Sequence, residues 1–355
     1  MTNNTPVIKK ETKNKIRIDF ERTSAWQRFK IKYLSVTFLG QVVFKIFRFI
    51  LLLGISFVIL YPFFSKITSS FMSPEDFVDA TVKLVPKYPT LKTYKAVITE
   101  NDYFQAMFNT AIVSLMCAVI QTFICCVIGY GFAKYKFKGS KFLFFMVVFT
   151  MIVPHQTLSY SMFLKFRYFD IGIFDFGILK LFGMEQGIKM VDTYWPLVVL
   201  SLTGLAFKNG LYIFMMRQFF RGVPDELEES AYIDGSGVFR TFIQIIIPLS
   251  VPMMITIFLF SFAWQWTDSF YTTTSMFFPG AKAPLLLPKI ATKIPKSIAS
   301  LIDASKGGQY AQVHDMYESA VKNTSAILIL FPLIIVYLFF QRYLIQGIER
   351  SGITG

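Results

Sequence analysis

The sequence predicts an all-α integral membrane protein with six transmembrane helices. Of its 355 residues, 54% are hydrophobic, whereas soluble domains contain about 45–50% apolar residues. A spanning helix requires roughly 20 mostly apolar residues. The six segments that satisfy this requirement are about 44–64, 106–133, 142–163, 194–216, 242–267 and 324–341. Segments of this length favour helices over the strands of a β-barrel, which need only about 10 alternating residues.

The distribution of Lys and Arg predicts that both termini lie in the cytoplasm. The stretch up to Arg48 carries 11 basic residues and 3 acidic residues, and the short loop 134–141 carries four Lys and no acid. By contrast, 65–104 and 164–193 each contain equal numbers of basic and acidic residues. Cytoplasmic flanks are enriched in Lys and Arg, so these counts place both ends of the chain inside, an arrangement that six spans satisfy. The net charge of +14 is then a topology signal that also attracts anionic lipid heads.

The chain begins with a polar, basic segment, 1–43, for which a cytoplasmic location is expected. This segment has no apolar core and no small-residue cleavage site, so it is not read as a signal peptide. The first span leads into an outer segment that extends to Asp102 and contains Pro74, Pro86 and Pro89. Short helices and turns are expected there, because proline interrupts longer helices.

The second and third spans are joined by the short basic loop and should both be helical. The second span begins near Phe104 and ends in G-Y-G-F-A-K-Y-K-F-K-G at 129–139. The third span is expected to end near Pro154 or continue to 163, before an outer insertion at 164–193. That insertion is long for a simple connection, which predicts that it has structure of its own.

The second half of the predicted transmembrane domain, which as a whole covers 44–345, repeats this alternation of spans and loops. The fourth span starts at Tyr194 and is followed by a cytoplasmic loop, 217–241. The fifth span is followed by the longest outer insertion, 269–322, which is rich in Lys, Ser and Pro. After the sixth span, the tail 346–355 is expected to return to the cytoplasm.

The most informative stretch is Pro224–Pro248, which is polar and acidic although it lies between two apolar spans. Proline suits the first position of a helix, and the four acidic residues that follow Pro224 suit the first turns because the helix dipole favours negative charge there. Gly235 is the expected end of this helix. A second short helix is expected from about Val238 into the fifth span. Two short helices joined at Gly235 would form a compact projection that fits a groove of a partner protein.

The spacing within this stretch resembles the EAA loop of ABC importer permeases, which reads E-A-A, three residues, G, nine residues, I-x-L-P. The chain departs from it by a serine in place of alanine and by Ile247 in place of leucine, both mild changes. The positions that correspond to the motif are Glu229, Ser230, Ala231, Gly235 and Pro248, and Ser230 is the serine that replaces alanine. The flanking sequence, F-N-T near Asn109, the end of the second span and the tail from Gln341 also look like the carbohydrate branch of this family. The resemblance extends over most of the chain from the first span onward.

This resemblance implies a type I ABC importer permease fold in a bacterial plasma membrane, and a set of partners. They are a second homologous permease, two ATP-binding cassette subunits that bind ATP and Mg²⁺, and an extracellular solute-binding protein that delivers sugar. The loop would seat in a cleft of an ATP-binding subunit. There Glu229 would make polar contact with the partner, Ala231 would allow close packing, Gly235 would permit the turn, and Asp234 would cap or pair locally. ATP-driven closure would then rock the spans between inward-facing and outward-facing states.

Candidate substrate-pathway residues lie on the second span and at the outer end of the fifth. Sugars are gripped by aromatic faces together with hydrogen-bonding side chains, and Trp264, Gln265 and Asp268 supply both. Gln265 stands where the related pattern has asparagine. Asn109 and Gln121 are polar residues inside a span, and such residues face a cavity or another helix. The competing interpretation is helix–helix hydrogen bonding and an aromatic belt at the membrane interface.

Several classes of function are disfavoured by what the sequence lacks. It contains no G-x-x-x-x-G-K-[ST] motif, so ATP binding by a P-loop is not expected in this chain, and no G-x-S-x-G nucleophile motif. The two histidines lie on separate segments without a cysteine cluster, so no metal site is expected. Nucleic acid is disfavoured because the basic residues form no aromatic-interleaved patch. Cys117, Cys125 and Cys126 all fall within the second span and are interpreted as packing residues.

The sequence therefore predicts a non-catalytic permease subunit of a carbohydrate importer. The main alternative is the same architecture carrying another solute, such as a polyamine or a glycerol phosphoester. A secondary transporter or channel is a weaker alternative, since no internal repeat and no charged pair at mid-membrane is evident.

Overall fold

The computed structural model describes a mainly helical chain. The described residues are 26, 36–77, 79, 81–170, 172–173, 176–177, 187–273, 276–280, 283–304 and 310–352. The chain divides into two compact units, Met1–Ser65 and Lys66–Gly355. Four helices in the described part are long and apolar enough to cross a membrane, and a bent pair of helices makes a fifth candidate. The count of six spans and the side of the membrane on which each terminus lies stay predictions.

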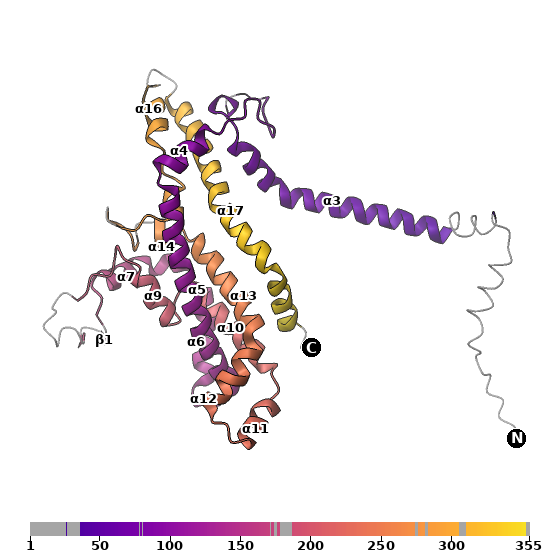
Figure 1. Ribbon diagram of the computed structural model, residues 1–355, viewed down its shortest axis with the longest axis vertical. Coiled ribbons are helices and arrows are strands. Elements are labelled where there is room, and N and C mark those ends of the chain that lie inside the picture. Colours follow the sequence, from indigo (N-terminus) through magenta and orange to yellow (C-terminus); the bar gives the residue numbers. More distant parts are fainter. Residues whose placement is uncertain are drawn as a thin grey trace. The chain divides into compact units, whose positions relative to one another are not determined.

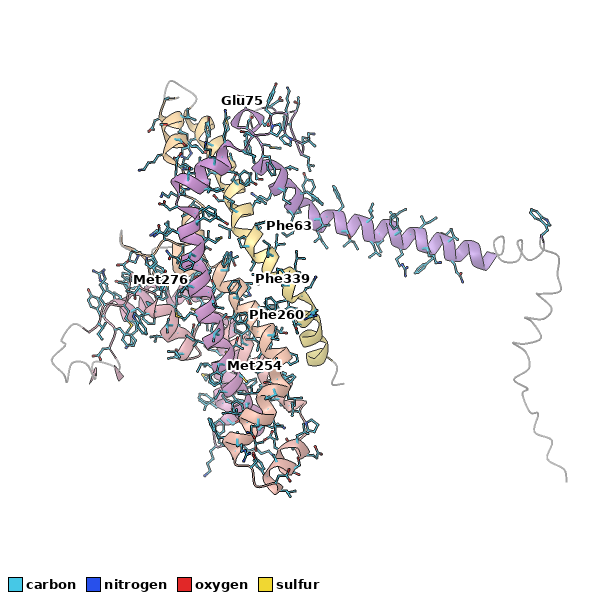
Figure 2. The ribbon with its side chains drawn as sticks, viewed as in Figure 1. Phe63, Glu75, Met254, Phe260, Met276 and Phe339 are labelled. Atoms are coloured by element: carbon cyan, nitrogen blue, oxygen red, sulfur yellow. The ribbon has the colours of Figure 1, made fainter. Side chains whose placement is uncertain are left out.

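The first unit contains most of α3 (Val36–Ser70), a helix of 35 residues that includes the expected first span. The side chains of its middle part are mainly apolar and project around the whole helix, and Phe63 is 57% exposed (Figure 2). A helix that is hydrophobic all round suits a lipid environment or a buried position. Most of the predicted N-terminal segment 1–43 lies outside the described residues.

The second unit is built around α5 (Tyr103–Lys134), which packs against α10 (Asn209–Arg221) and against α13 (Ile247–Trp266). A cluster of buried side chains that includes Cys125, Met216 and Ile257 forms a core between these helices. Gly129 allows the close approach of α5 and α10, because a Cβ atom there would lie 2.5 Å from the Cβ of Met216. Small residues at such crossings are typical of helix packing in membranes.

Helix α17 (Tyr310–Gly352) covers the expected sixth span and packs against α13 (Figure 1). It contains Pro332, whose missing N–H leaves the carbonyl of Leu328 without its usual helical partner. The Tyr103 hydroxyl donates a hydrogen bond to this carbonyl at 2.8 Å, and the Trp266 indole N–H donates to the next carbonyl, of Ile329, at 3.0 Å. Side chains of α5 and α13 therefore satisfy the backbone groups near the proline, as an apolar environment requires.

The third expected span, 142–163, is not one continuous helix. It is divided into α6 (Ser140–Ile152) and α7 (His155–Arg167), which meet at an angle of 103°. The physical reason is Pro154, which disfavours the helical conformation of the preceding residue. Val153 is accordingly extended, with φ −65° and ψ 121°.

The fourth expected span, 194–216, is also interrupted. It consists of α9 (Trp195–Leu202) and α10, separated by a non-helical segment, 203–208. Gly204 ends α9 in the left-handed conformation, with φ +72°, and Leu205 N–H donates back to the carbonyl of Leu200 at 3.0 Å. Apolar composition alone could not reveal this break, because the residues on both sides of it are hydrophobic.

The fifth expected span, 242–267, corresponds to a single helical stretch of 29 residues, Val238–Trp266, which ends one residue earlier. It is composed of α12 (Val238–Thr241), a π-helical turn labelled η2 (Phe242–Ile246) and α13. Pro248 lies at the start of α13, where the absence of its N–H is tolerated. The loop preceding this stretch is thus joined to the membrane helix without a break.

The outer segments consist of short elements that pack on one another. The segment after α3 contains η1 (Pro74–Phe77) and α4 (Lys92–Glu100). The described part of 164–193 contains a hairpin of β1 (Gly172–Ile173) and β2 (Phe176–Gly177), with Gly172 opposite Gly177. The described part of 269–322 outside α17 contains α14 (Phe270–Thr273), α15 (Leu287–Ile290) and α16 (Lys296–Ala304).

Asp192 ties the second outer segment to the third. Its N–H donates to the carbonyl of Phe277 at 2.6 Å, and its carboxylate accepts the N–H of Gly280 at 2.6 Å. A buried apolar cluster that includes Phe166, Val191 and Phe277 lies beneath this connection. The two insertions therefore form one packed cap in the part of the chain that the structure describes.

Candidate functional site

The acidic loop folds as two short helices joined by a tight turn, as its sequence predicts. Helix α11 (Glu226–Ile233) is followed by Gly235 with φ +79° and then by α12. Figure 1 shows α11 and α12 together at one end of the second unit, at the end away from α16. The expected start at Pro224 is wrong by two residues: Asp225 is the N-cap, and the helix begins at Glu226.

The inward side of α11 is held by a network of polar contacts from the end of α5. Lys134 Nζ donates to the carbonyl of Val223 at 2.7 Å and to the Asp225 carboxylate at 2.5 Å. It also forms an ion pair with Glu228 at 3.5 Å, and the Tyr130 hydroxyl donates to the other Glu228 oxygen at 3.0 Å. We call Tyr130, Lys134, Asp225 and Glu228 the anchoring network.

The two central groups of the anchoring network are shielded from solvent. The side chains of Lys134 and Glu228 are 8% and 11% exposed, whereas that of Asp225 is 78% exposed. The hydrogen bond from Lys134 holds the pKa of the Asp225 carboxyl below its ordinary value, with its positive charge as the second cause. Lys134 also lies in the last turn of α5, where the helix dipole favours a cation. Removing one partner of such a buried pair leaves an uncompensated charge.

The sequence-predicted loop residues lie on both sides of α11. Glu229 and Ser230 are exposed, and the Ser230 hydroxyl donates to the carbonyl of Leu227 at 3.1 Å. Ala231 is 5% exposed and faces the chain itself. Its carbonyl accepts the N–H of Ser236 at 2.9 Å, which closes the turn around Gly235. The small side chain of Ala231 therefore permits close packing within this chain.

The outward side of the loop carries large apolar side chains beside acidic ones. We call the residues Leu227, Glu229, Tyr232, Ile233, Val238 and Phe239 the loop surface. Ile233 is 86% exposed, Phe239 75% and Val238 52%. Contiguous exposed apolar side chains with a polar rim mark sites of protein–protein contact. Asp234, beside this surface, is exposed, and its N–H donates to the carbonyl of Ser230 at 3.0 Å.

Four of the five predicted substrate-pathway residues line one small cavity. Gln121, Trp264, Gln265 and Asp268 contribute to its wall, and its volume is about 20 Å³. Asn109 does not line this cavity, because its side-chain amide donates to the carbonyl of Leu285 at 2.9 Å. Gln121 is fully engaged: it donates to the Ser201 hydroxyl at 3.1 Å and accepts from the Ser261 hydroxyl at 2.8 Å. Gln121 thus connects α5, α9 and α13 by hydrogen bonds.

Asp268 lies just beyond α13 and is largely buried. One of its oxygens accepts the N–H groups of Phe270 and Tyr271, at 3.0 and 3.2 Å. Burial raises the pKa of this carboxyl to about 6, against the lowering effect of these two hydrogen bonds. The second oxygen of Asp268 and the amide nitrogen of Gln265 are buried without a partner among the described residues. The small cavity between them has room for about one water molecule.

A larger cavity lies beside the small one, where both interrupted spans have their breaks. Its volume is about 430 Å³, and residues 150–156 and 204–208 contribute most of its wall, together with Gly210 and Leu211. Ala206 and Phe207 line both cavities. We call it the break cavity. Sequence reasoning missed it, although Pro154-His155 and Lys208-Asn209-Gly210 are polar or helix-breaking signals within the apolar spans.

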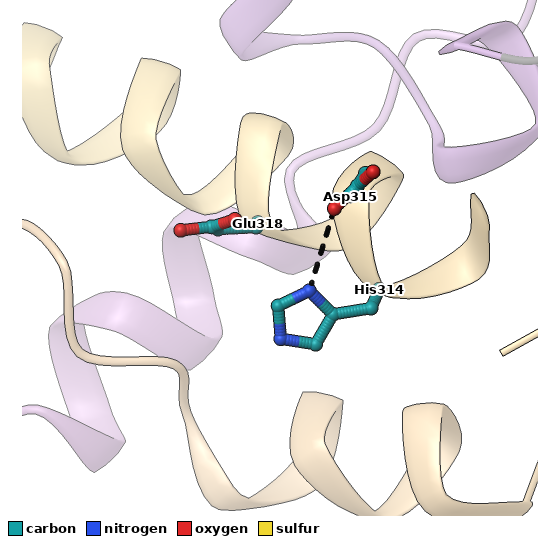
Figure 3. Close-up of side chains that lie close together, drawn as sticks. All are labelled: His314, Asp315 and Glu318. Carbon is teal, nitrogen blue, oxygen red and sulfur yellow. Dashed lines mark ion pairs between the residues drawn. The ribbon is translucent and has the colours of Figure 1, made fainter. Parts of the chain in front are cut away.

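Three potential metal ligands come together near the start of α17. One ligand atom each from His314, Asp315 and Glu318 lies within 4.8 Å of the others. Figure 3 shows the three side chains and the ion pair between His314 and Asp315. His314 Nδ1 is 3.6 Å from the Asp315 carboxylate, and Glu318 forms an ion pair with Lys322 at 2.6 Å. The side chain of Asp315 is 81% exposed. Neighbours on one helical turn, one already neutralised by lysine, do not make a closed coordination site.

Comparison with known proteins identifies relatives along most of the chain. Residues 126–350 match the family described as "Binding-protein-dependent transport system inner membrane component". The arabinooligosaccharides transport system permease protein AraQ of Bacillus subtilis is 24% identical over 88% of this chain and 97% of its own length. The trehalose transport system permease protein SugB of Mycobacterium tuberculosis is 24% identical over 77% of this chain and 85% of its own.

The fold also resembles that of a solved structure. One chain of a bacterial ABC transporter involved in the import of the acidic polysaccharide alginate superposes with a TM-score of 0.58. It is 20% identical in sequence, and the match covers 86% of this chain and 97% of that one. At this level of identity the likeness shows the fold alone.

Proposed function

Since the chain belongs to the family of binding-protein-dependent transport system inner membrane components, we propose that it is a permease subunit of an ATP-driven carbohydrate importer. The names of its relatives support a sugar as the transported solute, because AraQ and SugB belong to arabinooligosaccharide and trehalose transport systems. A bacterial plasma membrane is the proposed location, with six spans and both termini in the cytoplasm. The proposed alternative cargo is a non-sugar solute.

The observation that carries this proposal is the loop surface. It exposes Ile233, Phe239 and Glu229 on a projection that follows one broken span and leads without interruption into the next. A chain without a P-loop needs another subunit to supply the energy of ATP hydrolysis. We propose that the loop surface docks onto an ATP-binding cassette subunit, with Glu229 making the polar contact at its centre. A second permease, a second ATP-binding subunit and a solute-binding protein would complete the transporter.

The anchoring network explains how such docking would move the membrane helices. Lys134 and Tyr130 belong to α5, so a displacement of α11 is transferred to the end of this helix. Helix α12 continues into α13, which packs against α5 along its length. Packed helices move as rigid bodies, so closure of the ATP-binding subunits would rock α5 and α13 together.

The substrate pathway is proposed to pass the outer end of α13. Trp264 supplies an exposed aromatic face, and Gln265 and Asp268 supply buried polar atoms without partners among the described residues. The small cavity between them, at about 20 Å³, is too small for a sugar ring. A sugar would therefore need a rearrangement there or the neighbouring break cavity, whose volume of about 430 Å³ is within the range of ligand sites.

A charge reversal on the loop surface tests the proposal. In the Glu229→Lys variant, we expect substrate uptake and substrate-stimulated ATPase activity to fall at least about tenfold, because the reversed charge would remove the polar contact proposed for Glu229. Glu75→Lys, on an exposed position of η1 in the outer segment, is the matched control and should behave as wild type. Uptake and ATPase activity of Glu229→Lys at the wild-type level would contradict the docking role.

A separate measurement tests whether the transported solute is a carbohydrate. We expect uptake of labelled oligosaccharides by cells that express the assembled transporter, with competition by unlabelled sugar. If no member of a panel of neutral and acidic oligosaccharides is taken up or competes, the carbohydrate assignment fails and a non-sugar cargo replaces it.

A further inference from the structure

The break cavity contains a lysine in the middle of an expected span. Lys208 lies at the end of the non-helical segment that interrupts 194–216, and it lines the cavity of about 430 Å³. Ionisable residues within membrane-spanning segments are rare and mark pathways for substrates or ions. Non-helical backbone at membrane depth is tolerated where it is buried in protein or lines a water-filled cavity. Lys208 is an ionisable residue within an expected span, and it lies on non-helical backbone that lines a cavity. Both features indicate a functional position.

The backbone of Lys208 is held in an unusual conformation. Its φ is +72°, in the left-handed region that residues other than glycine rarely adopt. It is the N-cap of α10, whose next residue, Asn209, is fully buried. Such conformations persist where surrounding structure enforces them, and they cluster at functional sites.

Aromatic rings surround the ammonium group of Lys208. Its Nζ lies 4.7 Å from the centre of the Phe207 ring and 4.6 Å from that of Trp264, and these two rings are 5.5 Å apart. His155, which directly follows Pro154 at the start of α7, packs in a T-shaped arrangement against Phe207, with 4.6 Å between the ring centres. Phe207 lines the break cavity together with Lys208, whereas Trp264 lines the small cavity beside it. The wall of the break cavity therefore combines a cation with an aromatic ring of the kind on which a sugar packs.

No acidic side chain neutralises Lys208 within the break cavity. All of the residues that line it are described, and none is Asp or Glu. Asp268 lines the neighbouring small cavity, where its carboxylate accepts two backbone N–H groups. Within the described residues, no ion pair joins Asp268 or any other acid to Lys208. A positive charge of this kind in a partly desolvated cavity attracts an anion strongly.

We propose that the break cavity binds the sugar during transport and that Lys208 selects sugars bearing a carboxylate, that is, uronic acid units. The inference rests on the proposed carbohydrate function and narrows it. The carboxylate would pair with the Lys208 ammonium while the sugar ring lies against Phe207, which lines the same cavity. Charge-assisted hydrogen bonds of this type are shorter and stronger than neutral ones, which gives selectivity over an uncharged sugar of the same shape.

The test compares two ligands that share a sugar skeleton and differ in charge, with a small methyl group added to each carboxyl of the neutral one. Digalacturonic acid and its methyl ester have the same sugar skeleton, and the ester is neutral. Their binding would be measured with the purified, assembled transporter in detergent, without the solute-binding protein, so that selection by that protein does not contribute. We expect wild type to bind the acid at least about tenfold more tightly than the ester, a ratio that corresponds to about 1.4 kcal/mol.

Two variants separate charge from packing. In Lys208→Met, whose side chain is similar in length and also stacks on aromatic rings, the preference for the acid should disappear. In Lys208→Arg the charge is kept, so the preference should remain. Lys95→Met, at an exposed position of α4, is the matched control and should keep the wild-type ratio. Copurification of the partner subunits with each variant reports correct assembly.

The outcomes distinguish the inference from the function on which it rests. Equal affinity of wild type for acid and ester, or an unchanged preference in Lys208→Met, would overturn the role of Lys208. If neutral oligosaccharides are transported but the acid does not bind, the selectivity is refuted and the carbohydrate function stands. If no oligosaccharide of either kind is bound or transported, both fail.

Discussion

Replacing Lys134 by methionine should release α11 from the end of α5. The variant keeps the length of the side chain but removes its charge and its three donors. The carbonyl of Val223 and the carboxylate of Glu228 would then lose their contacts at 2.7 and 3.5 Å. Because the Glu228 side chain is only 11% exposed, water replaces these contacts poorly.

The magnitude follows from the burial of this pair. Breaking a fully buried ion pair by removing one partner costs about 3–5 kcal/mol. Both side chains keep some exposure, 8% and 11%, and the Tyr130 hydroxyl still donates to Glu228 at 3.0 Å. We therefore expect a smaller loss of docking free energy, about 2–3 kcal/mol. A loss of about 1.4 kcal/mol corresponds to a factor of ten in the population. The undocked population of α11 should rise by about 30- to 150-fold.

Hydrogen exchange of the backbone amides of α11 measures this change directly. When exchange occurs by local opening, its rate is proportional to the open population. Amides within Glu226–Ile233 of the assembled transporter should exchange faster in Lys134→Met by the factor given above, whereas those in the middle of α5 should not change. Sugar uptake per ATP hydrolysed should fall, because α11 would no longer transfer its displacement to α5.

Two controls limit the interpretation of that result. Lys138→Met alters an exposed lysine of the same basic loop and should leave the exchange of α11 as in wild type. Glu228→Gln loses the ion pair but can still accept from Tyr130, so its effect should be intermediate. If the amides of α11 exchange at wild-type rates in Lys134→Met, the anchoring network does not hold the loop, and the reasoning is refuted.

Two further predictions concern stability in detergent. Gly129→Ala places a Cβ atom 2.5 Å from that of Met216 and should destabilise the α5–α10 contact by about 1–3 kcal/mol; thermal unfolding would show a lower Tm. Gly131→Ala, where nothing lies within 4 Å, is the control, and equal Tm values for the two variants would contradict the close approach. Asp268→Asn keeps an oxygen for the N–H groups of Phe270 and Tyr271 but removes a charge whose folded-state pKa is about 6, above its ordinary 3.8. A folded-state pKa raised in this way contributes stability that is fully present below pH 3.8 and is lost as the pH rises through 6. At pH 8, Asp268→Asn should therefore be more stable than wild type by about 1–3 kcal/mol. Near pH 4 this difference in stability should vanish. An advantage that is the same at both pH values would refute the link to this carboxyl.

The loop could be predicted from sequence because its signals are local. The acidic first turn, Gly235 and the start of a second helix near Val238 each depend on a few neighbouring residues. The choice between Glu228 and Glu229 could not be made in the same way. Which of two adjacent acids is buried depends on the side of α11 that meets α5, and this is a tertiary contact.

The interruptions of the third and fourth expected spans could not be predicted from sequence in the same way. Apolar composition identifies the residues at membrane depth, but it is insensitive to a break that leaves the composition unchanged. Pro154 gave a local signal for the first break, whereas the break ending at Lys208 depends on the left-handed conformations of Gly204 and Lys208. The break cavity arises only when these two places come together in space, so no single segment of sequence could predict it.

The helical stretch Val238–Trp266 has a consequence for the energetics of the cycle. At 1.5 Å per residue, its 29 residues span about 43 Å, with Phe239 of the loop surface near one end and Trp264 of the proposed substrate pathway near the other. Tilting such a rod by about 10° displaces one end by about 7 Å relative to the other. Binding of a cargo near Trp264 and binding of a partner at Phe239 would therefore be coupled through the tilt of this one helix. Thermodynamic linkage then makes their effects reciprocal: a sugar that prefers one tilt must change the affinity for the ATP-binding subunit by the same factor as that subunit changes the affinity for the sugar.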